Sequence, residues 1–149
     1  MSYDLNRFIK AQDAKYEGYA SALSEIKGGR KLSHWIWYVF PQLKGLGWSS
    51  IAQYYGIDGV GEAAAYFAHP ILGARLIEIS RALIDLGETD AAKVLGHTDA
   101  MKVRSCMTLF LIVDPGNETF QAVLDKYYGG GLDERTREII KTRQYDEHH

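Results

Sequence analysis

Apolar residues recur at intervals of three and four along most of the chain, and this spacing places them on one face of an α-helix. The clearest case is the segment 70–86, which begins at a proline and ends before Gly87. Proline is tolerated in the first turn of a helix, and glycine often follows the last. The apolar stripe of this segment consists of Leu72, Leu76, Ile79, Leu83 and Leu86. We therefore predict an amphipathic helix here.

The same spacing runs from Leu5 to Ile26 and stops before Gly28, which predicts one long N-terminal helix. Further helical patterns, bounded by glycine, proline or capping residues, cover 50–57, 62–69, 90–96, 100–113, 118–128 and 134–143. No segment alternates as a half-buried strand would, and no repeat or low-complexity linker is present. We predict a single all-α domain over residues 1–149, with seven or eight helices, no significant β-sheet and a flexible tail from about residue 144 to 149.

The stretch SHWIWYVFPQ, residues 33–42, contains six consecutive aromatic or aliphatic residues, 35–40, most of which must be buried. Periodicity cannot separate a helix from a buried strand where nearly every position is apolar. If the stretch is a short helix, Ser33 is placed to cap it and Pro41 to end it. A spacing of 100° per residue then puts His34, Trp37 and Tyr38 on one side. The remaining residues, which we predict to be core, are Trp35, Ile36, Val39 and Phe40.

The sequence resembles the uncharacterised bacterial family known as domain of unknown function 1810 in four segments, RFIKAQ, ALSEIKGGRKLSHWIWYVFPQLKGLG, EAAAYFAHPILGARL and VLGHTDAMKVRSCMTLF. The most specific part is the signature KLSHWIWYVFPQ. The resemblance extends from Arg7 to about Thr136. It implies a compact all-helical fold and brings no established activity. Some relatives carry the label calpastatin, which is a disordered repeat inhibitor. This chain has no repeats and 12% aromatic residues, enough to form a core, so we discard that label.

The composition narrows the class of protein. With 46% hydrophobic and 24% charged residues in 149, the chain is typical of a globular domain. A net charge of -2 provides no overall field to attract nucleic acid or an anionic membrane. The longest apolar run, 107–113, is too short to span a bilayer, and no signal peptide is present. One cysteine, Cys106, fits a reducing compartment, so we expect a cytoplasmic location and no membrane partner.

Basic and aromatic residues gather in the acid-free stretch between Glu25 and Asp58. This combination suits a planar anionic ligand such as a nucleotide, through stacking and charge pairing. The alternative is a solvated loop beside a buried segment. His34 could donate to a ligand oxygen or act as a general base, which makes it a weak catalytic candidate, or it could bond a neighbouring carbonyl.

A second polar cluster lies in the segment 100–113, whose C-terminal half is apolar on every face. Its members are Lys102, Arg104, Ser105 and Thr108. They must face solvent, pair with internal acids or line a cavity, because burying them without partners is costly. Cys106 lies among apolar neighbours, so packing explains it better than catalysis. We predict no metal site, since no spacing matches a zinc or di-iron framework. His148 and His149 are either native or the start of a purification tag, and we give them no functional weight.

The leading hypothesis is a cavity for a small anionic, nucleotide-like ligand, with no cofactor and no reaction that can be named. Its predicted ligand-binding residues are Arg30, Lys31, His34, Trp37, Gln42, Lys102, Arg104, Ser105 and Thr108. The alternative is a protein-interaction or adaptor domain without catalysis, which would use Tyr54, Tyr55, Tyr127 and Tyr128 unless they are core. Nucleic-acid binding ranks third because no motif supports it. A homo-oligomer is compatible with all three.

Overall fold

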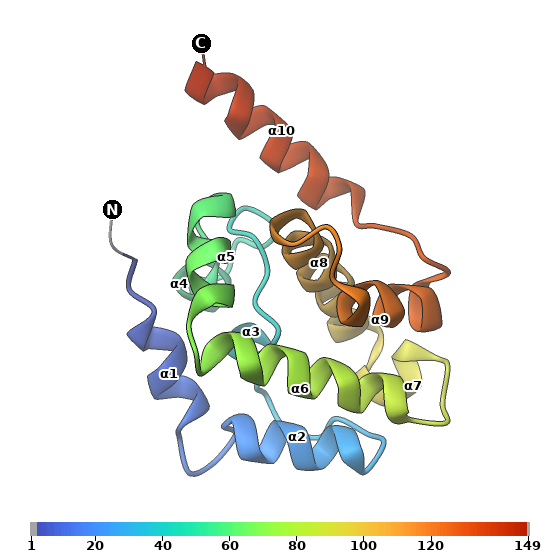
Figure 1. The fold of residues 1–149 in the computed structure, drawn as a ribbon. Helices are drawn as coiled ribbons and strands as arrows, with labels where there is room; N and C mark the ends of the chain where they lie inside the picture. Colours follow the sequence, from blue (N-terminus) through green and yellow to red (C-terminus); the bar gives the residue numbers. More distant parts are fainter. Residues whose placement is uncertain (1–2, 149) are drawn as a thin grey trace.

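The computed structural model describes residues 3–148, with side chains described to residue 144. These residues form ten helices and no β-strand, apart from one isolated bridge between Leu43 and Ile57 (Figure 1). The all-α prediction is confirmed, although the helices number ten rather than seven or eight. They are α1 (Asn6–Gln12), α2 (Tyr19–Lys27), α3 (Ile36–Val39), α4 (Ser50–Tyr55), α5 (Gly59–Ala68), α6 (Leu72–Asp85), α7 (Ala91–Leu95), α8 (His97–Val113), α9 (Glu118–Tyr128) and α10 (Glu134–His148).

The single N-terminal helix predicted from residue 5 to 26 is wrong, because the chain turns between α1 and α2 (Figure 1). Glu17 has a φ of 55°, and the buried Gly18 follows it. A Cβ atom at Gly18 would lie 2.3 Å from the carbonyl oxygen of Ala14. Only glycine therefore fits this turn, and the apolar spacing that continues across it belongs to two helices that pack on the same core.

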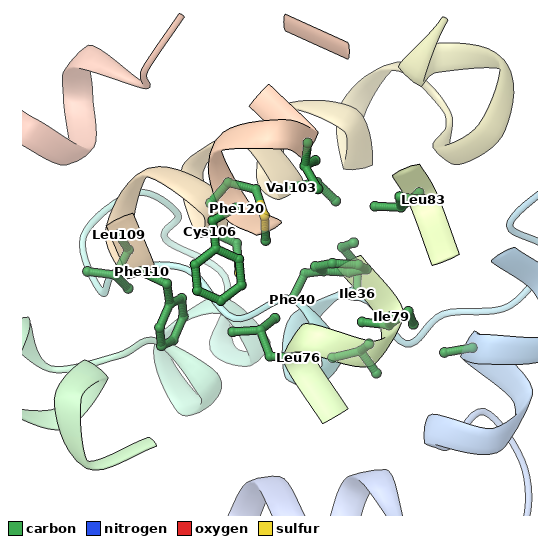
Figure 2. Packing of buried hydrophobic residues seen from close by; sticks show 14 of the residues in the cluster. Ile36, Phe40, Leu76, Ile79, Leu83, Val103, Cys106, Leu109, Phe110 and Phe120 are labelled. Carbon is green, nitrogen blue, oxygen red and sulfur yellow. The ribbon is translucent and has the colours of Figure 1, made fainter. Parts of the chain in front are cut away.

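The core lies around α8, which packs against α5, α7, α9 and α10, while α6 packs against α2, α5 and α9. Figure 2 shows side chains of α6 and α8 meeting there, with Ile36 and Phe40 among them. The labelled residues of the two helices are Leu76, Ile79, Leu83, Val103, Cys106, Leu109 and Phe110. Because α8 is surrounded on several sides, its C-terminal half is apolar all round.

The four aromatic and aliphatic residues predicted as core in the stretch 33–42 are buried, with Trp35 fully so. The helix there is shorter than predicted, since α3 begins at Ile36 and no side chain caps it. The predicted cap Ser33 instead donates its hydroxyl to Glu25, at 2.7 Å. The capping prediction is wrong because a charged acceptor at the end of α2 lies within reach of this hydroxyl.

The backbone of α10 continues to His148, so the predicted tail includes the last turn of a helix. Most of that tail lies outside the residues whose side chains are described, and its flexibility stays a prediction. Within residues 3–148, every helix is either too short or too polar to pass through a bilayer.

Candidate functional site

A cavity of about 250 Å³ lies where the loop after α3, the N-terminal half of α8 and the start of α10 meet. Five of the nine predicted ligand-binding residues line it, namely Trp37, Gln42, Lys102, Arg104 and Ser105. The other lining residues carried no signal that was used to predict them: Leu46, Gly47, Thr98, Met101, Asp133 and Arg135. Trp37 and Gln42 of the first cluster thus meet Lys102, Arg104 and Ser105 of the second at one cavity.

The aromatic wall of the cavity is Trp37, which is half-buried and packs against the core on its inner side. Trp37 therefore lies at the boundary between the core and the cavity. The Lys102 ammonium lies 4.8 Å from the centre of the indole ring, within the range of a cation–π contact. The same ammonium is 3.1 Å from Oδ1 of Asp99. Lys102 is therefore held in position from two sides.

Two of the cations that line the cavity, Lys102 and Arg104, are half-buried. Lys102 forms an ion pair with Asp99, whereas Arg104 forms none with the described residues. Its Nε donates to the carbonyl oxygen of Gly131 at 2.9 Å, and its Cζ lies 6.0 Å from the ring centre of Tyr128. A Cβ atom at Gly131 would lie 2.6 Å from Nη2, so glycine leaves the space that the guanidinium occupies. Among residues 3–144, whose side chains are described, neither Nη1 nor Nη2 has a hydrogen-bond or ion-pair partner.

Ser105 and Thr108 join α8 to the segment that precedes α10. The Ser105 hydroxyl donates to Oδ2 of Asp133 at 2.9 Å and lines the cavity. Thr108 is fully buried. Its Oγ1 donates to the carbonyl of Arg104 and accepts the backbone N–H of Asp133, both at 2.8 Å, so this hydroxyl has its partners inside the protein. The structure therefore does not bring Thr108 to the cavity surface, and that part of the prediction is wrong.

His34 does not share the cavity, contrary to the prediction. Its side chain is 90% exposed and its Nδ1 lies 3.3 Å from Oε1 of Glu17. The helical spacing used to place it does not apply, because α3 begins two residues later at Ile36. Its position gives no support to catalysis.

Arg30 and Lys31 also lie elsewhere, lining a separate depression beside α7. The Lys31 side chain is only 7% exposed, and its ammonium lies 2.9 Å from Oδ2 of Asp99. The predicted placement of both residues in the cavity is wrong. Asp99, at the start of α8, pairs with Lys31 and keeps this basic stretch beside α7. Glu25 contributes as well, accepting the backbone N–H groups of Leu32 and Ser33 and the Trp35 indole N–H.

Three of the four tyrosines of the interaction hypothesis are half-buried rather than exposed on the surface. Tyr127 donates its hydroxyl to the carbonyl of Leu83, and Tyr128 donates to that of Ala100. Burial, helped by Glu88, raises the pKa of Tyr127 to about 12. Tyr55 is half-buried, so Tyr54 is the exposed member of the four.

Cys106 lies fully inside the core, where burial raises the pKa of its thiol well above the ordinary value (Figure 2). A buried neutral thiol is a poor nucleophile, which agrees with a packing role. Among the described residues, no group of three or more histidine, cysteine, aspartate or glutamate side chains is arranged to hold a metal ion.

A larger and shallower depression, of about 590 Å³, follows the outer face of α6. Its charged lining residues are Lys27, Glu78, Arg81 and Asp85. Two of these side chains are cationic and two are anionic, and all four residues are exposed. A solvated helix face has this character, so the smaller cavity beside α8 is the better candidate site.

An all-helical domain with a cavity lined by basic and aromatic side chains is thus defined by the fold and the site. The chain belongs to the family described as protein of unknown function (DUF1810), whose model matches residues 2–140. This match confirms the resemblance found in the sequence. The chain is also similar to the conserved hypothetical protein Rv1873 from Mycobacterium tuberculosis, whose crystal structure at 1.38 Å gives a TM-score of 0.89. The two are 42% identical, and the match covers 93% of this chain and 97% of that one. None of the curated proteins matches the chain.

Proposed function

We propose that this domain binds a small anionic ligand with a planar ring, such as a nucleotide, in the cavity beside α8. The observation that carries the proposal is the guanidinium of Arg104. It is half-buried at the cavity and oriented through Nε, and its two terminal nitrogens are without partners among the described residues. A guanidinium oriented in this way can donate two parallel hydrogen bonds to a phosphate or carboxylate.

The charges around Arg104 favour an anion. Three cationic side chains line the cavity, those of Lys102, Arg104 and Arg135, against the single carboxylate of Asp133. Lys102 shares Asp99 with Lys31, so even this paired lysine is only partly neutralised. The cavity therefore attracts negative charge although the whole chain carries a net charge of -2.

The apolar side of the cavity supplies a surface for a ring. Its apolar lining includes Trp37, Leu46 and Met101. A flat ring against these side chains and an anionic group near Arg104 would use both parts of the cavity. A cytoplasmic location, expected from the single cysteine, remains part of the proposal.

The test is calorimetric titration with nucleoside monophosphates, using Arg104→Gln and the matched control Arg81→Gln. Arg81 is an exposed arginine of α6 outside the cavity. Losing a charge-assisted hydrogen bond costs about 1.5–3 kcal/mol, so Arg104→Gln should weaken binding roughly 10- to 100-fold. Arg81→Gln and His34→Ala should leave the Kd unchanged.

A thermal-shift measurement gives an independent readout. A nucleotide at 100 times its Kd should stabilise the native state by about 2.7 kcal/mol. If neither nucleoside monophosphates nor inorganic phosphate stabilises the protein, the proposal fails. It also fails if Arg104→Gln and Arg81→Gln weaken binding equally.

A second candidate is an interaction surface on α4. Trp48 is 78% exposed just before this helix, and Ile51 and Tyr54 follow it at intervals of three. Exposed aromatic residues are frequent in interface hot spots. If this surface joins two copies of the chain, Trp48→Ser should convert a dimer into a monomer in sedimentation analysis. A wild-type protein that stays monomeric at high concentration would remove a self-association role.

A further inference from the structure

Among the described residues, Asp133 is the one carboxylate in the lining of the cavity, and hydrogen bonds hold it in place. Its Oδ2 accepts hydrogen bonds from the hydroxyl of Ser105, at 2.9 Å, and from the backbone N–H of Thr136, at 3.2 Å. The Thr136 hydroxyl donates to the same oxygen. The backbone N–H of Asp133 donates a hydrogen bond to Oγ1 of Thr108. The carboxylate is therefore fixed by neutral donors of α8 and α10.

The second oxygen of this carboxylate remains unused. Within the described residues, Oδ1 of Asp133 accepts no hydrogen bond, and Asp133 forms no ion pair. Among the described residues, every side-chain oxygen or nitrogen that is buried away from solvent has a hydrogen-bond partner. Oδ1 must therefore be accessible, and Asp133 lines the cavity beside Arg104.

A fixed carboxylate oxygen is a poor neighbour for a bare oxyanion, because like charges repel at short range. It is a good acceptor for a hydroxyl group, and dinucleotide-binding folds use an acidic residue in this way to bind a ribose hydroxyl. A ligand that suits this cavity therefore carries an anionic group for Arg104 and a neutral hydroxyl donor for Asp133. A nucleoside monophosphate has both within one sugar phosphate.

The size of the cavity limits the ligand that it can enclose. Typical ligand pockets measure roughly 300–1,000 Å³. At about 250 Å³ this cavity is below that range, and its lining residues Met101 and Arg135 are exposed. A mononucleotide that leaves part of itself in solvent fits these dimensions, whereas a dinucleotide is too large to be enclosed.

We infer that Asp133 is the specificity-determining residue of the cavity, selecting ribonucleoside monophosphates over bare oxyanions by accepting a ribose hydroxyl at Oδ1. This inference rests on the proposed function, because it concerns the ligand of the same cavity. It adds that the sugar hydroxyls are recognised as well as the phosphate.

The first test compares three probes on the wild-type protein by calorimetry. Adenosine 5′-monophosphate should bind about tenfold or more tightly than its 2′,3′-dideoxy analogue, which lacks the hydroxyl donors. Inorganic phosphate should bind more weakly still. Equal affinities for the nucleotide and its dideoxy analogue would overturn the inference while leaving the proposed function intact. If no probe binds, both fail.

The second test uses Asp133→Asn, with Asp90→Asn as its matched control. Asp90 accepts the backbone N–H of Ala92 as the cap of α7, outside the cavity, so the control makes the same charge change at the same kind of cap. In Asp133→Asn the preference for the ribonucleotide should disappear, and phosphate should bind several-fold more tightly. Asp90→Asn should change neither. A preference that survives in Asp133→Asn contradicts the inference, and the three-probe comparison decides it should this variant not fold.

Discussion

The guanidinium of Arg7 and the carboxylate of Glu62 face each other through two hydrogen bonds, Nη1 to Oε2 at 2.9 Å and Nη2 to Oε1 at 3.1 Å. Their side chains are only 9% and 4% exposed. Arg7 also donates to the carbonyl oxygens of Tyr54 and Gly56. One ion pair thus joins α1 to α5 and to the end of α4.

Glu62→Leu should lower the free energy of unfolding by about 3–5 kcal/mol, because it leaves the buried charge of Arg7 without its partner. Urea denaturation would measure this loss. The double variant Arg7→Met, Glu62→Leu should lose less than the sum of the two single changes, because it leaves no buried charge unpaired. Additive losses would mean that the two groups do not interact appreciably.

Trp35→Ala should cost about 3–5 kcal/mol of stability, because it removes a fully buried ring and leaves a cavity. Trp48→Ala is the matched control. Since Trp48 is largely exposed, this second change should stay within about 0.5 kcal/mol. Chemical denaturation of both variants checks the prediction, and a loss below about 1 kcal/mol for Trp35→Ala would contradict the core assignment.

The core of this fold could be predicted from sequence because burial leaves a periodic signal. The stripe from Leu72 to Leu83 and the aromatic run at Trp35 both lie where the pattern put them. The turn at Gly18 was missed because apolar spacing continues across it. A glycine inside a helical pattern was the available sign of a break.

The candidate site could be predicted only in part. Trp37 and Arg104 were found because a bulky ring and a cation in apolar segments are unusual. His34 was misplaced by a helical register that begins only at Ile36. Asp133 gave no signal beyond that of a helix cap, because its approach to the cavity depends on how α10 packs against α8.

Cys106→Ser should lower stability by about 1–3 kcal/mol, since it introduces a hydroxyl into a fully buried site. Nucleotide binding should remain within twofold of the wild type, because the thiol packs in the core and is absent from the cavity lining. Calorimetry and denaturation measure the two effects separately. Loss of binding in a variant that still folds would instead implicate the thiol in function.

Acidification should destabilise the protein through Glu25. Burial opposes ionisation of this carboxyl, but the hydrogen bonds from Leu32, Ser33 and Trp35 outweigh burial and lower its pKa from the ordinary 4.5 to about 2. Because the folded pKa lies below the unfolded one, the stabilisation is complete above pH 4.5 and is lost as the pH falls from 4.5 towards 2.

The variant Glu25→Gln isolates this contribution. At pH 7 it should be less stable than the wild type by about 1.5–3 kcal/mol, the usual contribution of hydrogen bonds to a charged group. Between pH 4.5 and 2 the difference between the two proteins should shrink. Unfolding measured across this range checks the prediction, and a constant difference would show that another group is responsible.

The three consecutive glycines 129–131 do not all serve the same purpose. Gly129 and Gly130 have φ values of 60° and 78°, which the reversal of the chain after α9 requires. Gly131 has no such backbone, and what it provides is room for the guanidinium of Arg104. Its identity is therefore tied to a residue 27 positions earlier. Among relatives of this chain, a side chain at position 131 should accompany the loss of arginine at position 104, whereas glycine at 129 and 130 should vary independently of the site.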